Sequence, residues 1–194
     1  MRVKLEQIAD IRTGYTFREA VNRAERGGVP FVQMSDLEDL NQQNISRLKR
    51  TNMKIRPDWV LQEGDLLIKA RGTDFYPVIV QKELQGAVFT HPLLRLRLNQ
   101  ALALPEFIAW QLSQPKIQKQ LLRFAAGTLV QVLNLDAFKE LELDLPALRQ
   151  QQCVQAIQPL IRREEKLLSL LAIKRKQLIN KRICQFALNE NRIK

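Results

Sequence analysis

Few side chains in this sequence have the type and spacing needed for catalysis. His91 is the only histidine among 194 residues, and because a proline follows it, a satisfied polar residue is a simpler interpretation than a general base. No cysteines and histidines have metal-ligand spacing. The chain also lacks the glycine-rich lysine loop of nucleotide sites, the glycine-rich turn of dinucleotide or methyl-donor pockets, and Gly-x-Ser-x-Gly. These patterns predict a binding protein with no metal and no cofactor.

A nuclease site is the enzymatic alternative that has suitable residues. Pro57-Asp58 and Glu164-x-Lys166 have the residue types of a metal-dependent nuclease, but they are far apart in the sequence and the second pair lies in a helical stretch. Asp65 follows Gly64 and is interpreted as a turn residue. We therefore interpret these carboxylates as structural and expect the chain to be noncatalytic.

The charge of the chain is unevenly distributed. The formal net charge is +11, which points to an anionic partner or a basic assembly surface. Residues 1–146 hold 20 Lys and Arg against 17 Asp and Glu, whereas residues 147–194 hold 11 against 3. Most of the excess positive charge therefore lies in the last quarter of the chain.

Cysteine usage and hydropathy predict a cytoplasmic protein. Cys153 and Cys184 would lie roughly 45 Å apart along a helix, too far for a disulfide within it, so a reduced compartment is expected. The chain has neither a signal-like start nor an apolar run long enough to span a membrane. We expect no membrane partner.

The last quarter of the chain is predicted to form one long helix. Pro146 suits a first helical turn, no glycine follows it, and apolar residues recur every three or four positions. About 40 residues would form a rod of about 60 Å, which needs a partner along its apolar stripe. Glu164 and Arg175 interrupt the heptad pattern, and Pro159 is expected to bend the rod. The predicted dimerisation stripe consists of Val154, Ile157, Ile161, Leu168, Leu171 and Leu178.

The preceding residues predict a strand-rich, mixed α/β domain. Apolar and β-branched runs predict strands at residues 29–34, 66–70, 78–81, 86–89, 93–98 and 139–143. Prolines begin two predicted helices, residues 105–112 and 115–125. The predicted fold class is thus α+β: a domain over residues 1–146, a long coiled-coil-type helix over residues 147–188 and a polar tail over residues 189–194.

Several short motifs follow one another in a specific order. The most characteristic is Glu63-Gly64-Asp65-Leu66-Leu67-Ile68, with Arg71-Gly72 after it. The other motifs are Lys4-Leu5-x-x-Ile8-x-x-Ile11-x-x-Gly14, Val29-Pro30-Phe31-Val32-x-x-Ser35-Asp36-Leu37, Pro105-x-Phe107-Ile108, Gly127 to Leu133, Leu141-x-Leu143-x-Leu145-Pro146 and Gln150 to Gln152. In this order and spacing, they resemble the specificity subunit of bacterial type I restriction–modification systems over nearly the whole chain.

This resemblance implies a role and partners. Specificity subunits of the family are noncatalytic: a target recognition domain reads double-stranded DNA, and the subunit docks methyltransferase subunits, which bind the methyl donor. They carry two recognition domains and two long helices, whereas this chain has one of each. The chain therefore resembles a half-sized specificity subunit.

Loop residues with hydrogen-bond donors are the expected DNA contacts. Arginine reads guanine, glutamine or asparagine reads adenine, and lysine holds phosphate. The candidates are Gln33, Ser35, Arg47, Lys49, Arg50, Lys69, Arg71, Thr73, Tyr76, Thr128 and Gln131. A solvated surface role is the alternative for each of them.

Two alternatives remain open. The chain could be a coiled-coil assembly protein whose head binds protein and reads no DNA sequence. Alternatively, residues 105–125 could form a helix-turn-helix in which Lys116, Lys119 and Arg123 face DNA.

The predicted helix also suggests how the chain assembles. An antiparallel pair would place two domains at opposite ends, as in one full specificity subunit. We expect a homodimer that recognises an interrupted palindrome. Pairing with a second specificity chain would instead give an asymmetric site. The basic run Lys174-Arg175-Lys176 is interpreted as a solvated face, or as a docking surface for an acidic partner.

Overall fold

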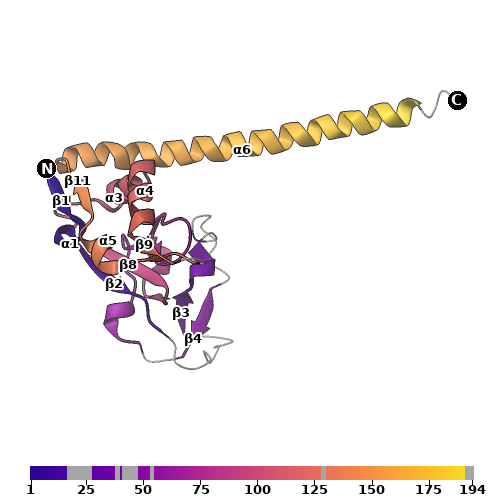
Figure 1. Cartoon of the computed structure of the whole chain (residues 1–194). Helices are drawn as coiled ribbons and strands as arrows, with labels where there is room; N and C mark the ends of the chain where they lie inside the picture. The colour runs from indigo at the N-terminus through magenta and orange to yellow at the C-terminus, as the bar shows by residue number, and fades with distance from the viewer. Residues whose placement is uncertain (17–27, 38–39, 41–47, 53–54, 128–129, 191–194) are drawn as a thin grey trace. The chain divides into compact units, whose positions relative to one another are not determined.

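The computed structural model describes residues 1–16, 28–37, 40, 48–52, 55–127 and 130–190 (Figure 1). Of residues 162 and 187–190 it describes the backbone alone. The chain divides into two compact units, Met1–Val154 and Gln155–Lys194.

A four-stranded sheet forms the centre of the first unit. Its strand order is β2 (Ala9–Thr13), β8 (Leu93–Leu98), β5 (Leu66–Lys69) and β6 (Val78–Ile79), and all neighbours are antiparallel. Both faces of β5 are buried, which explains its unbroken apolar run. The predicted strands at residues 66–70 and 93–98 are thereby confirmed.

A second sheet has three strands. β3 (Val29–Val32) lies between β4 (Lys49–Thr51), to which it is antiparallel, and β7 (Val88–Phe89), to which it is parallel. The strand predicted for residues 29–34 is shorter than expected. Residues Met34–Asp36 form a 3-10 turn instead, because the Asp36 carboxylate accepts a hydrogen bond from the Gln33 amide at 2.8 Å.

Two short strand pairs complete the sheet structure. β1 (Arg2–Lys4) pairs with β11 (Glu142–Asp144), and these two segments lie side by side in Figure 1. β9 (Ala125–Ala126) pairs with β10 (Val132–Leu133). Both pairs are antiparallel, and neither joins the larger sheets.

The helices of the first unit are short. Among the described residues, the α-helices with defined bounds are α1 (Leu5–Ile8), α3 (Pro105–Leu112), α4 (Pro115–Phe124) and α5 (Leu135–Lys139). The predictions for α3 and α4 are confirmed, and both begin with proline.

The strand predicted for residues 139–143 is partly wrong. Asn134 caps the start of α5 by accepting hydrogen bonds from the amides of Asp136 and Ala137, and this stabilised helix occupies residues up to Lys139. The strand therefore starts only at Glu142.

Two hydrophobic clusters lie on opposite faces of β5. Leu66 and Ile68 belong to the cluster that includes Phe107 and Leu121 from the helices. Leu67 belongs to the other cluster, which includes residues of the three-stranded sheet such as Phe89. Alternation along one strand thus distributes its side chains between the two clusters.

Two arginines of β8 form partly buried ion pairs. Arg97 and Asp65 form a two-pronged pair, with Nε–Oδ1 and Nη2–Oδ2 both 2.8 Å. This pairing raises the pKa of Arg97, and Asp65 is only 2% exposed. Arg95 pairs with Asp10 and donates to the main-chain oxygen of Asp58 at 3.0 Å, while burial lowers its pKa. Asp65 also accepts from the Gln62 amide, so it is both a turn residue and an ion-pair partner.

The long helix, α6, runs from Leu148 to Glu190. It begins two residues after Pro146, and buried Gln151 fixes its first turn. The Gln151 side chain accepts from the Leu104 amide at 2.9 Å and donates to the main-chain oxygens of Leu102 and Pro146. The helix continues through Pro159. Within the described residues, no helix is sufficiently long and apolar to cross a membrane.

Candidate nucleic-acid interface

One group of candidate residues gathers where β5 ends. We call this group, Lys69, Arg71, Thr73, Tyr76 and Gln131, the Arg71 surface. The loop after β5 lies against β10: the Gly72 amide donates to the main-chain oxygen of Gln131 at 3.0 Å, and Arg71 forms an isolated antiparallel bridge with Val132. The structure thus brings together residues about 60 positions apart in the sequence.

The side chains of the Arg71 surface differ in their availability. Arg71, Thr73 and Tyr76 are exposed, and Tyr76 retains 52% of its accessible surface. Lys69 is partly buried and lies 3.5 Å from the carboxylate of Asp74. The Gln131 amide oxygen is buried and has no hydrogen-bond partner among the described residues. Arg71 is therefore the member best placed to contact a base edge.

A glycine allows the turn between β9 and β10. Gly127 has a φ of +133°, and a Cβ atom there would lie 2.2 Å from the Val130 oxygen. No other residue type fits this position without movement of the backbone. The neighbouring candidate Thr128 lies outside the described residues.

A second group of candidates surrounds the β3–β4 pair. The Lys49 ammonium donates to the Gln33 amide oxygen at 2.8 Å, and Arg50 donates to the Gly28 oxygen at 2.9 Å. The Ser35 hydroxyl contacts the Asp36 carboxylate at 3.3 Å. We call Gln33, Ser35, Lys49 and Arg50 the Lys49 surface. The remaining candidate of this basic run, Arg47, lies outside the described residues.

The two surfaces are connected through residues 90–92. The Thr90 amide donates to the Val32 oxygen at 3.0 Å, at the end of β3, and the Ala70 amide donates to the Pro92 oxygen at 2.7 Å, just after β5. Because β3 and β7 are parallel, their ends lie at the same sheet edge. Both sets of donors therefore flank one segment, in which His91 is exposed.

The basic residues of the helix-turn-helix alternative lie on the exposed face of α4, as that alternative requires. Lys116, Lys119 and Arg123 are exposed on α4, whereas Ile117 and Leu121 are buried, so α4 is amphipathic as expected.

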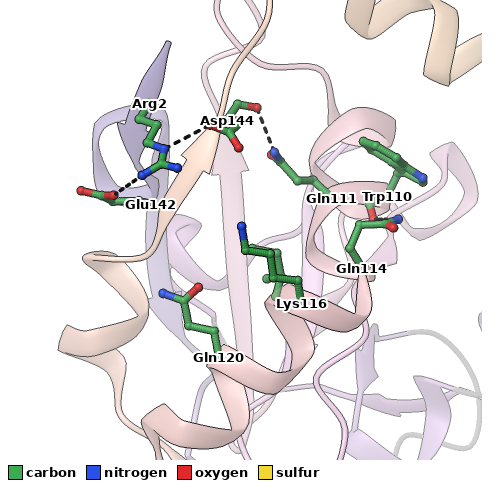
Figure 2. A pocket seen from close by; sticks show the side chains of 9 residues that line it. Arg2, Trp110, Gln111, Gln114, Lys116, Gln120, Glu142 and Asp144 are labelled. Carbon is green, nitrogen blue, oxygen red and sulfur yellow. Dashed lines mark hydrogen bonds and ion pairs between the residues drawn. The ribbon is translucent and has the colours of Figure 1, made fainter.

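Beside α4 lies an open groove of about 360 Å³ (Figure 2), with Arg2, Trp110, Gln111, Gln114, Lys116, Ile117, Gln120, Glu142 and Asp144 in its wall. Arg2 lies 3.9 Å from Glu142 and 3.4 Å from Asp144, and Gln111 donates to the Asp144 main chain at 2.9 Å. The two carboxylates beside Lys116 disfavour a phosphate there.

The residues of the nuclease alternative have other contacts. The Asp58 carboxylate is 2.8 Å from Arg12, and Glu164 lies on α6. Across the part of the chain that the structure describes, no three His, Cys, Asp or Glu residues group as metal ligands would. Asp58 thus has a structural role as an ion-pair partner.

The second unit exposes a broad apolar band. Its members are each at least 40% exposed and are Ile157, Leu160, Ile161, Leu167, Leu168, Leu170, Leu171, Ile173, Leu178, Ile179, Ile183 and Phe186. Five of the six predicted stripe residues belong to it. Val154 differs, because it belongs to the first unit and is half-buried against the hydrophobic cluster that contains Leu66 and Ile68.

Two exposed apolar residues of this surface are not predicted by the pattern of hydrogen-bond donors in the sequence. Val130 and Val132 flank Gln131 and are 55% and 41% exposed. The available sequence signal is an inverted alternation, in which the apolar residues face outward and the polar residue faces inward.

The fold is that of a strand-rich domain followed by a long helix. The chain belongs to the type I restriction modification DNA specificity domain family, whose model matches residues 1–181. The resemblance found in the sequence motifs is thereby confirmed. No curated protein matches the chain.

Solved structures show the same fold. The HsdS subunit from Thermoanaerobacter tengcongensis is 19% identical, with a TM-score of 0.63 over 84% of this chain and 37% of that chain. The type I restriction–modification S subunit from M. genitalium is 17% identical, with a TM-score of 0.59 over 91% of this chain and 42% of that chain.

A third structure comes from work on complex assembly and conformational transition of a type I system. It is 18% identical, with a TM-score of 0.65 over 87% of this chain and 39% of that chain. This chain thus spans 37–42% of the length of these three similar proteins.

Proposed function

We propose that the chain is the noncatalytic, DNA-reading specificity component of a type I restriction–modification complex. It directs methyltransferase subunits to a bipartite site in double-stranded DNA. The observation that carries this proposal is the convergence of the Arg71 and Lys49 surfaces on residues 90–92 in a member of the specificity family. Residues 1–146 serve as the target recognition domain, residues 147–188 as a dimerisation and spacer helix, and residues 189–194 as a polar tail.

The exposed band on α6 supports assembly through the helix. Apolar residues this numerous along one helix are stabilised when a partner covers them. A second copy is the simplest partner, and two identical domains would read inverted half-sites. The alternative is a second specificity chain, which would give an asymmetric site. Basic residues of α6 then remain for methyltransferase subunits.

Alanine at Arg71 is expected to weaken binding to the cognate site by about 1–3 kcal/mol and to relax specificity, because a bidentate guanine contact would be lost. Alanine at Lys69 should weaken binding to all duplexes similarly and reduce the salt dependence, as expected for a phosphate contact. Fluorescence anisotropy with cognate and scrambled duplexes, at several salt concentrations, measures both effects.

The matched controls are Lys119→Ala and Arg123→Ala, which remove exposed cations from α4. They should bind like the parent chain. Losses confined to these two variants would move DNA reading to the helix pair. Absence of salt-dependent binding to any duplex would favour the assembly protein with a protein-binding head.

The isolated chain is expected to transfer no methyl group and to cut no DNA. Transfer of tritiated methyl groups from the methyl donor to duplex DNA should appear only when a methyltransferase subunit is added, because the chemistry belongs to that subunit. Methyl transfer by the purified chain alone would contradict a noncatalytic role.

A further inference from the structure

The segment Val130–Leu133, whose last two residues form β10, exposes two β-branched apolar side chains and turns an amide oxygen inward. Val130 and Val132 are exposed, whereas Leu133 is buried and the Gln131 amide oxygen points away from solvent without a hydrogen-bond partner among the described residues. A strand on a solvated surface normally turns β-branched apolar residues inward and amides outward. The outward valines and the inward glutamine are therefore costly for the free chain.

The inversion occurs next to the best-placed donor. Arg71 and Val132 are partners in an antiparallel bridge, so their side chains leave the same face. Their Cβ atoms are expected about 4.5–5.5 Å apart, which is similar to the rise of one to two base steps of about 3.4 Å. An arginine that holds guanine would thus place Val132 over a neighbouring base.

An apolar side chain beside an arginine suits the thymine methyl group of duplex DNA. In the major groove, thymine alone among the four bases presents a methyl group, and apolar side chains read it by contact. The surrounding charge suits DNA more than an apolar protein surface, because Arg71 is exposed and the nearby acid, Asp74, already pairs with Lys69.

Resting on the proposed function, we infer that Val130 and Val132 contact thymine methyl groups beside the base read by Arg71. These valines are then specificity-determining residues, and their outward orientation is maintained for contact with DNA. The small size of a methyl group limits the effect of each contact.

The test removes the methyl group from DNA and the valine from the protein separately. A binding site is first selected by the full chain from randomised duplexes, and each thymine is then replaced by deoxyuridine. One or more replacements should weaken binding by the parent chain about fourfold, the effect expected for one buried methyl-sized group. Val130→Ser and Val132→Ser should bind the thymine site about fourfold more weakly, and one of them should lose its sensitivity to deoxyuridine at that position.

A surface control comes from elsewhere in the same unit. Leu102 is 43% exposed, and its amide donates to the main-chain oxygen of Asn99 at 2.9 Å, distant in the sequence from the Arg71 surface. Leu102→Ala should retain the full response to deoxyuridine. A response that persists in both valine variants, or its absence from the parent chain at every position, overturns the inference.

Failure of the inference is distinguishable from failure of the proposed function. If the chain binds DNA specifically but deoxyuridine does not weaken binding at any position, the proposed function is supported and the thymine contact is contradicted. If the valine variants lose association with a methyltransferase subunit while remaining sensitive to deoxyuridine, the valines form a protein contact instead. If no duplex is bound in a salt-dependent manner, the proposed function fails and the inference falls with it.

Discussion

Replacing Leu168 and Leu171 together by aspartate is expected to leave the chain monomeric at concentrations where the parent chain is a dimer. Both leucines are more than half exposed on α6. Full burial of a leucine is worth about 1.5–3 kcal/mol. A twofold dimer would bury both leucines of each copy. Loss of these contacts alone would weaken dimerisation by about 6 kcal/mol, or about four orders of magnitude.

Sedimentation equilibrium measures this effect directly. The control is a double variant on the opposite side of the helix, Ser169→Asp with Gln177→Asp, since these positions project away from the two leucines at 3.6 residues per turn. It adds the same charge and should remain dimeric. A parent chain that is already monomeric, or an unchanged mass in the leucine variant, would show that a different chain covers the band.

Asp65→Ala is expected to destabilise the first unit by about 3 kcal/mol, because it removes the buried Asp65 carboxylate and leaves the partly buried Arg97 guanidinium without its counter-charge. Both Asp65 oxygens lie 2.8 Å from that group. Adding Arg97→Met should recover part of the loss, since the remaining charge is then removed as well. Chemical denaturation followed by tryptophan fluorescence suits this measurement, because Trp59 and Trp110 both belong to the first unit.

The matched control for the Asp65–Arg97 ion pair is a solvent-exposed ion pair. Arg2 lies 3.4 Å from Asp144, with about 70% of each side chain exposed. Arg2→Ala should change the free energy of unfolding by about 0–1 kcal/mol. Equal losses in the Asp65 and Arg2 variants would mean that burial of the Arg97 pair contributes nothing.

Local signals in the sequence predict the longer elements of this fold. The run Leu66-Leu67-Ile68 indicates a buried strand, and prolines mark the first turns of α3 and α4. The repeating apolar residues after Pro146 predict α6 within two residues at each end. Each of these signals lies within the element that it predicts, so no knowledge of distant contacts is needed.

Features that depend on distant contacts could not be predicted in the same way. Asp65 was recognisable as a turn residue, but its pairing with Arg97 depends on the register between β5 and β8. The sequence identifies each candidate donor individually, whereas their convergence on residues 90–92 depends on the parallel pairing of β3 with β7. The outward direction of Val132 follows from its bridge to Arg71, which no local pattern encodes.

The pairing of β1 with β11 has a consequence for synthesis of the protein. Arg2 is opposite Asp144 in this pair, so the first strand has no partner until almost the whole first unit has been made. At about 5–20 residues per second, translation of the intervening chain takes about 7–28 s. During that time the apolar side chain of Val3 lacks its native cover from Leu143. Closure of the domain is therefore a late event in the folding of the first unit.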